Sequence, residues 1–336
     1  MTGFGRDLLP NIRGRVQEHD GPFPKGCCKA NRGLTLSEVA RVVRTAPKRY
    51  KTYKIRKRSG GQRTIAQPAR ELKDLQYFLM ETLLSQFSVH DAAKAYRKGM
   101  SIRDNAQPHA DKAALLKLDF IDFFGSLKPR DFDKLCESNE IDLDDDDRMF
   151  CHQILFWRER PGDDLKLSIG APSSPMFSNA VMYDFDKQIT NICSEVDVIY
   201  TRYADDLAFS SNNVETLFEI KNSMPRILRE LRYPIVYINQ EKTCLVTRKH
   251  RLTVTGLVLA NDGSVSLGRD RKRRIRAAVH SLVQGRLDDE EAESLRGQLA
   301  FTNSVEPEFL IRLKRKYGAA QIDDIMKKPF RRRYQR

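Results

Sequence analysis

The sequence predicts a mixed α+β fold that ends in a basic, helical region. Short runs that alternate or are wholly apolar, as strands do, lie at 50–55, 114–118 and 198–202. Longer segments have apolar residues at helical spacing, as at 71–87, and from about residue 268 the spacing is that of helices. With 336 residues, the chain is long enough for one large multi-lobed unit or two domains.

Turn residues and apolar spacing predict the other elements. Gly60-Gly61 favours a hairpin turn, and Pro68 ends the returning strand. In chain order we expect an irregular arm over 1–34, a helix over 35–43, strands over 50–55 and 62–66 around a turn at 59–61, a helix over 71–87, an acidic loop at 144–147, helices over 149–157 and 214–231, strands over 234–239 and 253–260, and helices over 271–283 and 290–301.

Basic residues are concentrated on both sides of the acidic motifs described below. The chain has 59 Lys and Arg against 45 Asp and Glu, a net charge of +14. Residues 41–63 contain ten Lys or Arg and no Asp or Glu, and residues 268–336 contain 18 against 10. An acid-free basic run of this length, together with a basic C-terminal region, favours a phosphate backbone as the partner.

Several other classes of protein do not fit the sequence. No run of about 18 apolar residues is present, so we expect no membrane span and no membrane partner. The first ten residues lack the apolar core of a signal peptide. The six cysteines include no Cys-x-x-Cys pair, which favours reduced thiols and a cytoplasmic location over disulfides or zinc.

An acidic pair is expected at the tip of a hairpin. Tyr203-Ala204-Asp205-Asp206 lies between the apolar runs 198–202 and 207–210, which predict two strands. Neighbouring ionised aspartates repel each other, and a fold tolerates them mainly where a cation lies between them. The pair alone is weak evidence, because such pairs also occur in solvated turns.

A third carboxylate, Asp119, ends the apolar run 114–118, which predicts a buried strand. Carboxylates from two separate strand ends can hold two Mg²⁺ ions, because Mg²⁺ prefers oxygen ligands and leaves positions for substrate phosphates. Two such ions can activate an attacking hydroxyl and stabilise a leaving pyrophosphate. Taken alone, Asp119 could equally be a helix cap.

These motifs resemble those of reverse transcriptases. The box Tyr203-Ala204-Asp205-Asp206 is similar to the YxDD signature of that family. Residues 118–124 resemble its first palm motif, and residues 170–175 with the following Ser178-Asn179 resemble its second. The three motifs occur in the order that the family has them.

Two further patterns resemble the retron branch of this family. Asn105 to His109 matches its NAxxH pattern, and Val254-Thr255-Gly256 matches its VTG pattern. Taken alone, Asn105 and His109 could simply fix a loop through hydrogen bonds, and Gly256 could be a bulge. Their joint occurrence favours a retron enzyme over intron-type or phage-defence relatives.

The resemblance covers about residues 35–318 and implies a right-hand polymerase with fingers, a palm built on an antiparallel sheet, and a helical thumb. It also implies the metal ligands, which are Asp119, the Phe120 carbonyl, Asp205 and Asp206 around two Mg²⁺ ions. The implied division of the chain is an N-terminal arm at 1–34, fingers with the NAxxH region at 35–112, a palm at 113–267 with inserted fingers helices at about 128–165, and a basic thumb and tail at 268–336.

A nucleotide site is implied as well, formed by Lys57, Arg63, Phe124, Ile169 and Gly170. Lys57 and Arg63 would grip the triphosphate, since a guanidinium binds phosphate oxygens bidentately, although residues 56 and 58 are equally basic. Phe124 stands where the family keeps an aromatic that blocks a 2′-hydroxyl, although it could be an ordinary core aromatic. Ile169 departs from the usual glutamine of the second palm motif and cannot make the hydrogen bonds of that side chain.

The remaining implied residues serve catalysis or bind RNA and primer. Lys242 matches a later palm motif whose lysine can protonate the leaving pyrophosphate, with a solvated surface lysine as the alternative. The implied RNA or primer contacts are Asn105, His109, Tyr203, Val254, Thr255, Gly256, Arg271, Lys272, Arg273, Arg274 and Arg276. Phosphate contacts supply affinity rather than a reading of base sequence.

The expected activity is therefore RNA-directed DNA synthesis from deoxynucleoside triphosphates. The retron resemblance implies a structured non-coding RNA as template, a guanosine 2′-hydroxyl as primer, a branched RNA–DNA product, and antiphage defence beside an effector protein. Two alternatives stay open. One is a ribonucleoprotein scaffold that restrains a toxic effector, and the other is a non-retron reverse transcriptase with a different primer.

Overall fold

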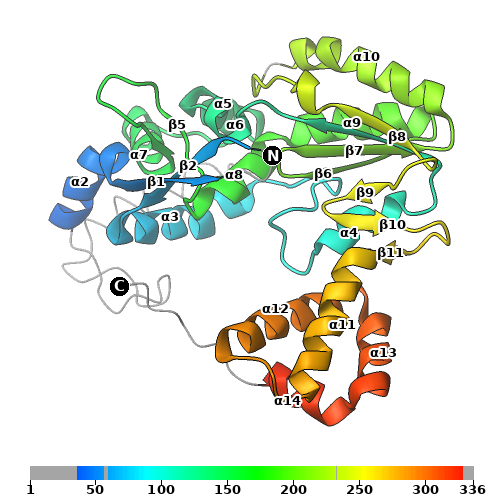
Figure 1. Cartoon of the computed structure of the whole chain (residues 1–336). Helices are drawn as coiled ribbons and strands as arrows, with labels where there is room; N and C mark the ends of the chain where they lie inside the picture. Colours follow the sequence, from blue (N-terminus) through cyan, green and yellow to red (C-terminus); the bar gives the residue numbers. More distant parts are fainter. Residues whose placement is uncertain (1–35, 57–59, 232, 328–336) are drawn as a thin grey trace.

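An antiparallel sheet of four strands, in the order β6-β7-β3-β8, forms the centre of the fold. The computed structural model describes residues 36–56, 60–231 and 233–327. The strands of the sheet are β3 (Ala114–Asp119), β6 (Ile199–Tyr203), β7 (Asp206–Ser211) and β8 (Cys244–Thr247). In β3, Leu115, Leu116 and Leu118 are all buried, because the strand lies between β7 and β8 and is covered on both faces. The helices that pack against this sheet include α9 (Tyr183–Glu195) and α10 (Val214–Glu230) (Figure 1).

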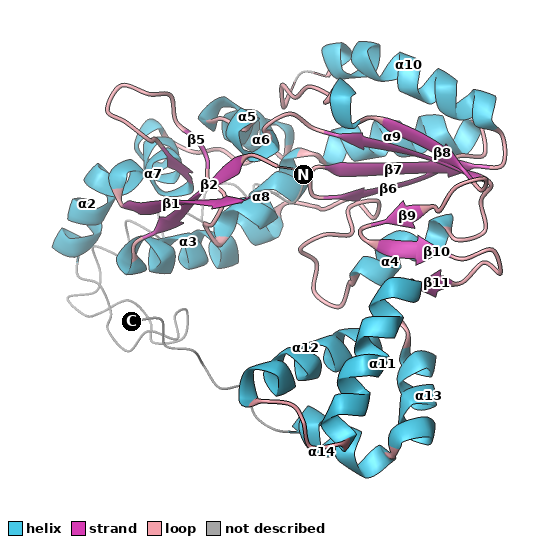
Figure 2. Ribbon diagram, viewed as in Figure 1, coloured by secondary structure: helices cyan, strands magenta, loops and turns pink. Residues whose placement is uncertain are grey.

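A β-hairpin and several helices lie beside the central sheet and contain most of the N-terminal half (Figure 2). Strand β1 (Tyr50–Arg56) pairs with β2 (Gln62–Pro68) over their whole length. The accompanying helices are α2 (Leu36–Thr45), α3 (Arg70–Thr82), α5 (Phe123–Ser126), α6 (Pro129–Ser138), α7 (Asp145–Leu155) and α8 (Ser173–Val181). The short elements nearby are the 3-10 turns η1 (Ala46–Lys48) and η2 (Leu84–Gln86) and the strands β4 (Phe156–Trp157) and β5 (Lys166–Leu167). The predicted first helix and hairpin are confirmed.

The prediction of an acidic loop at 144–147 is wrong. Helix α7 begins at Asp145, and Asp144 caps it by accepting a hydrogen bond from the Asp147 backbone N–H at 2.8 Å. Carboxylates in the first turn are favourable, because they face the positive end of the helix dipole and its unpaired N–H groups. The same helix ends at Leu155 rather than at residue 157.

Two predicted strands near the end of the sheet are also corrected. The segment 253–260 is a hairpin of β9 (Thr253–Val254) and β10 (Leu257–Leu259), because Thr255 and Gly256 both have positive φ, as a two-residue hairpin turn requires. The segment 234–239 forms only one bridge, between Ile238 and Phe120. Strand β8 already occupies that edge of β3, so this segment reaches only the end of the strand.

The C-terminal region has a hydrophobic core of its own, shared with the small sheet β11-β10-β9. Its elements are β11 (Val265–Ser266), α11 (Arg269–Val283), α12 (Asp289–Val305), α13 (Pro307–Tyr317) and α14 (Ala319–Lys327). Ala106 at the end of α4 (Ile102–Ala106) belongs to the same core, and η3 (Gln107–His109) follows α4. The 3-10 turn η4 (Gln240–Lys242) precedes β8. Glu306 ties this region together by accepting hydrogen bonds from Lys272 at 2.6 Å and from the Leu267 backbone at 3.1 Å. Figure 1 shows the four helices α11–α14 as a bundle at one end of the molecule. The predicted C-terminal helices are confirmed.

Within residues 36–56, 60–231 and 233–327, no helix has both the length and the apolar character needed to cross a bilayer. Four cysteines in this part of the chain are free thiols, and three of them are buried in the main core.

Candidate active site

Asp119 and Asp206 are direct cross-strand partners at the end of the central sheet. Asp119 is the last residue of β3, and Asp206 is the first residue of β7. The backbone carbonyl of Asp205 accepts a hydrogen bond from the Phe120 N–H at 3.2 Å, so the tip of the β6–β7 hairpin is attached to the end of β3. Residues that lie 86 or more positions apart in the chain thus form one acidic end of the sheet.

Lys242 provides positive charge at this acidic end. Its Nζ donates to Asp119 Oδ1 at 2.7 Å. Burial, the neighbouring Asp205 and Asp119 raise the pKa of the Asp206 carboxyl to about 6. Burial and Asp119 also raise the pKa of Asp205, while Arg63 and Lys242 oppose this shift. The three carboxylates therefore repel one another when they are ionised, and a cation between them would relieve this repulsion.

The donor set fits divalent cations, although its side chains are not arranged as a ready site. In the part of the chain that the structure describes, no three His, Cys, Asp or Glu side chains form a group that could hold a metal ion as they stand. The Asp119 carboxylate accepts a hydrogen bond from Lys242 and interacts with the Asp206 carboxyl group. Carboxylate oxygens are the ligands that Mg²⁺ prefers, and the repulsion among the three groups would be relieved by such an ion.

A cavity of about 700 Å³ opens on one side of Asp205. Of the residues implied to bind nucleotide, Arg63, Phe124, Ile169 and Gly170 all line it. Phe124 is half-buried and packs edge-on against the buried Phe123, with ring centroids 5.5 Å apart. Lys57 lies outside the described residues.

The second palm motif is attached to the hairpin through its backbone. The Ile169 carbonyl accepts a hydrogen bond from the Ala66 N–H at 2.8 Å. Gly170 has φ +125°, and a Cβ at this position would lie 2.9 Å from the Ala66 carbonyl oxygen. A side chain at residue 170 would therefore push the motif away from β2. Ile169 contributes its backbone to this contact and is also one of the residues that line the cavity.

The cavity also contains residues that the motifs did not point to. Tyr96 lines the cavity, and its backbone has a positive φ of +60°. Partial burial and the nearby Asp205 raise the pKa of the Tyr96 hydroxyl. Lys73 and Lys166 bring further positive charge, and the Lys166 ammonium lies 5.4 Å from the centre of the Trp157 ring. Tyr96 falls in the stretch before Asn105, but single lysines on a helix and a short strand leave no sequence signal.

A second hollow of about 490 Å³ lies next to Asp119 and Asp206. The predicted primer residues that line it are Asn105, Tyr203, Val254, Thr255 and Gly256. Asn105 is buried, and its side-chain oxygen has no hydrogen-bond partner among the described residues. An unpaired buried oxygen costs about 1–3 kcal/mol unless a ligand or water pairs with it.

His109 does not reach either hollow, because it is fully buried under the hairpin. Its Nδ1 is 2.6 Å from Ser210 Oγ on β7, and its Nε2 is 2.8 Å from Thr201 Oγ1 on β6. Burial lowers the pKa of the imidazole to about 3. The ring therefore supports the two strands from inside, in contrast to the RNA contact that the resemblance implied.

The basic cluster on α11 is divided between internal and exposed positions. Lys272 is ion-paired with Glu306 at 2.6 Å, and the Arg271 guanidinium lies 4.9 Å from the centre of the Phe301 ring. The exposed members of the cluster are Arg273, Arg274 and Arg276. Lys272 thus stabilises the helical region through its ion pair with Glu306. The exposed arginines are the members of the cluster that are available to a phosphate backbone.

An antiparallel sheet with three carboxylates at one end, flanked by a basic cavity and a basic helical region, is typical of a template-directed nucleotide polymerase. Residues 55–259 match the family model described as reverse transcriptase (RNA-dependent DNA polymerase). The chain is 39% identical to the Retron Ec83 reverse transcriptase of Escherichia coli, over 83% of this chain and 90% of that protein. It is 32% identical to the Retron Ec73 reverse transcriptase of Escherichia coli, over 84% of this chain and 92% of that protein.

The chain therefore belongs to the retron reverse transcriptases, which are RNA-directed DNA polymerases. The predicted family, enzyme class and mixed α+β polymerase fold are confirmed. Among solved structures, a telomerase from Candida albicans in complex with a TWJ fragment of telomeric RNA is 14% identical with a TM-score of 0.42. The match covers 83% of this chain and 61% of that one, which is less than two thirds of its length.

Proposed function

We propose that this enzyme copies part of a structured non-coding RNA into DNA, starting from the 2′-hydroxyl of a guanosine and leaving a branched RNA–DNA product. The retron relatives support this assignment. The observation that carries it is the pairing of Asp119 with Asp206 at the hairpin tip, with Lys242 in contact and a cavity of about 700 Å³ alongside.

Asp119, Asp205, Asp206 and the Phe120 carbonyl would hold two Mg²⁺ ions. When bound, such ions lower the pKa of the primer hydroxyl and stabilise the charge on the leaving pyrophosphate. Lys242 balances the charge of Asp119 and supplies a proton to the pyrophosphate. The cluster of carboxylates supports this role, because their mutual repulsion is relieved by cations.

Nucleotide and primer occupy separate hollows in this proposal. Arg63 and Phe124 line the cavity of about 700 Å³. Arg63 binds the triphosphate together with Lys57, and Phe124 stacks against the sugar so that a 2′-hydroxyl does not fit. The VTG turn and Tyr203 hold the primer end in the hollow of about 490 Å³. The unpaired oxygen of Asn105 supports this placement, since a bound nucleic acid can donate the hydrogen bond that the protein lacks there.

The division of labour along the chain is proposed to follow the right-hand plan, with fingers at 35–112, a palm at 113–267 and a thumb at 268–336. The two hydrophobic cores support separate N-terminal and C-terminal units. The exposed arginines of α11 support a thumb that contacts the phosphates of RNA or duplex. The small sheet β9–β11 shares its core with the thumb helices, so we expect it to move with them.

The test is to purify the protein with its nucleic acid and sequence what is bound. Wild type should carry branched RNA–DNA, and the Asp205→Asn/Asp206→Asn double variant should carry RNA without DNA. Asp197→Asn is the matched control, because Asp197 is an exposed aspartate just before the same hairpin and has a positive φ that Asn also tolerates. Unbranched DNA in the wild type would contradict the priming mechanism while leaving polymerisation intact.

Antiphage defence with an effector protein is the biological role that we propose for the product. This role is what the resemblance to retrons implies, and the exposed basic residues of α11 favour a complex with RNA. A scaffold without a need for DNA synthesis is the second candidate. Protection from phage that survives the Asp205→Asn/Asp206→Asn change would favour the scaffold.

A further inference from the structure

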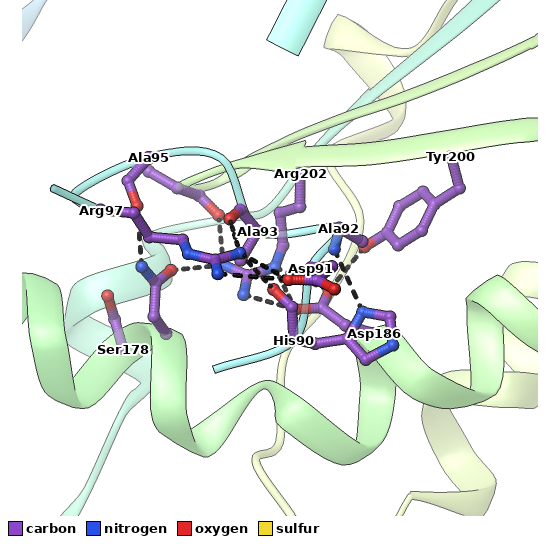
Figure 3. A network of polar contacts seen from close by, with 12 residues as sticks. His90, Asp91, Ala92, Ala93, Ala95, Arg97, Ser178, Asp186, Tyr200 and Arg202 are labelled. Carbon is purple, nitrogen blue, oxygen red and sulfur yellow. Dashed lines mark hydrogen bonds and ion pairs between the residues drawn. The ribbon is translucent and has the colours of Figure 1, made fainter. Parts of the chain in front are cut away.

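Arg202, directly before the YADD box, is fully buried together with its partner Asp186 on α9 (Figure 3). Its Nε donates to Asp186 Oδ1 at 2.8 Å, and its Nη2 donates to Asp186 Oδ2 at 2.6 Å. A buried ion pair of this kind contributes little net stability compared with apolar residues of the same size. We therefore expect the ion pair to matter for the geometry that it imposes on the residues around it.

The third arm of the guanidinium holds the catalytic turn. Nη1 of Arg202 donates to the Ala204 carbonyl at 3.1 Å and to Asn179 Oδ1 at 3.3 Å. Ala204 has φ +58°, a conformation that costs a residue with a Cβ about 1–2 kcal/mol. The residue after it is Asp205, so the direction of the held carbonyl sets the direction in which the acidic pair leaves the turn.

The same network holds the segment of a second strained residue, which also lines the cavity. Asn179 Nδ2 donates to the Ala95 carbonyl at 2.8 Å, and the next residue, Tyr96, has φ +60°. The Arg202 backbone adds two hydrogen bonds of 2.8 Å to the same segment, one with the Ala92 carbonyl and one with the Lys94 N–H. Figure 3 shows this segment beside the Arg202 side chain.

Tyr96 is thus held through hydrogen bonds to the backbone of its segment. Its side chain lines the nucleotide cavity with Arg63, Asp205 and Phe124, and the residue is 54% exposed. An exposed tyrosine on a strained and firmly held backbone has no role in the core. Such strain is kept where the surrounding structure enforces a particular direction of a side chain.

We propose that Arg202, Asp186 and Asn179 form a positioning network that orients the catalytic turn and Tyr96 together, and that Tyr96 contacts the incoming deoxynucleoside triphosphate. This rests on the proposed function, because it takes the cavity as the nucleotide site. Arginine suits the position, since its planar fork can donate in three directions at once, whereas the single ammonium of lysine cannot reach all the acceptors. The flat ring of Tyr96 offers a face to the base or sugar of the nucleotide.

Steady-state extension of an added primer on an RNA template tests the proposal, with kcat and KM for the nucleotide measured separately. Tyr96→Ala should raise KM at least tenfold, whereas Tyr96→Phe should stay within threefold because the ring carries the contact. Asn179→Ala should lower kcat at least tenfold without leaving a buried charge unpaired. Arg202→Lys should lower kcat further if it folds.

Tyr200→Phe is the matched control for the network. The Tyr200 hydroxyl also donates to Asp186 Oδ1, at 2.8 Å, but among the described residues it makes no hydrogen bond to the turn or to Tyr96. Its loss should lower the melting temperature and leave kcat and KM within threefold of wild type. A folded Asn179→Ala variant with wild-type kcat and KM would overturn the proposal, as would an equal loss in Tyr200→Phe. An inactive wild type would instead refute the proposed function.

Discussion

Replacing His109 by glutamine should remove one acid-sensitive component of the enzyme's stability. Burial lowers the pKa of His109 from 6.5 to about 3, so the folded protein keeps the ring neutral where the unfolded chain would protonate it. The stability that the neutral ring contributes is complete above pH 6.5 and is lost as the pH falls from 6.5 towards 3. Each pH unit in this window removes about 1.4 kcal/mol.

At pH 5 the loss due to His109 amounts to about 2 kcal/mol, because pH 5 lies about 1.5 units below the unfolded pKa. Urea unfolding at pH 5, 6 and 7 measures it. His109→Gln should be less stable than wild type at pH 7, since the bonds to Ser210 and Thr201 are altered, but its stability should fall less on acidification. The difference in slope isolates His109 from the carboxylates that titrate in both proteins.

His250→Gln is the control, because His250 is exposed in the loop after β8. This variant should keep the full pH dependence of wild type. Equal slopes for wild type and His109→Gln would refute the reasoning, since they would mean that the buried ring does not resist protonation.

Three further predictions concern catalysis and RNA binding. Asp119→Asn should abolish primer extension yet leave RNA binding within a few fold, as measured by single-nucleotide incorporation and filter binding; extension at the wild-type rate would argue against the metal role. Phe124→Ala should raise the use of ribonucleotides at least tenfold, and unchanged sugar selectivity would remove the gate assignment. Reversing the charge of Arg273 and Arg274 should weaken RNA binding and lower its salt slope by about 2, because two phosphate contacts are lost; an unchanged slope would mean that both side chains face only solvent.

The pattern of neighbouring residues was sufficient to predict the β1–β2 hairpin and the buried strand that ends at Asp119. Both rest on patterns of neighbouring residues, apolar runs and alternation, that report burial of short segments directly. The segment 144–147 is not the loop that its composition predicts, because its aspartates interact with a helix terminus that the composition does not reveal. Four consecutive aspartates look solvated, but Asp144 caps helix α7 and the other three lie in its first turn, where the helix dipole offsets the cost of their charges.

Only the tertiary structure decided which side chains meet. Lys272 binds Glu306, which is 34 positions away, and His109 enters the space beneath two strands that come about 90 residues later. The turn at Ala204 and the segment of Tyr96 are joined through the buried side chains of Arg202 and Asn179, although neither residue type nor spacing indicates such a link. The sequence determined the kind of chemistry, because carboxylates can bind metal ions and basic residues can bind phosphates wherever they lie in the chain. Burial and direction decided which of them carry it here, and both depend on contacts between distant segments.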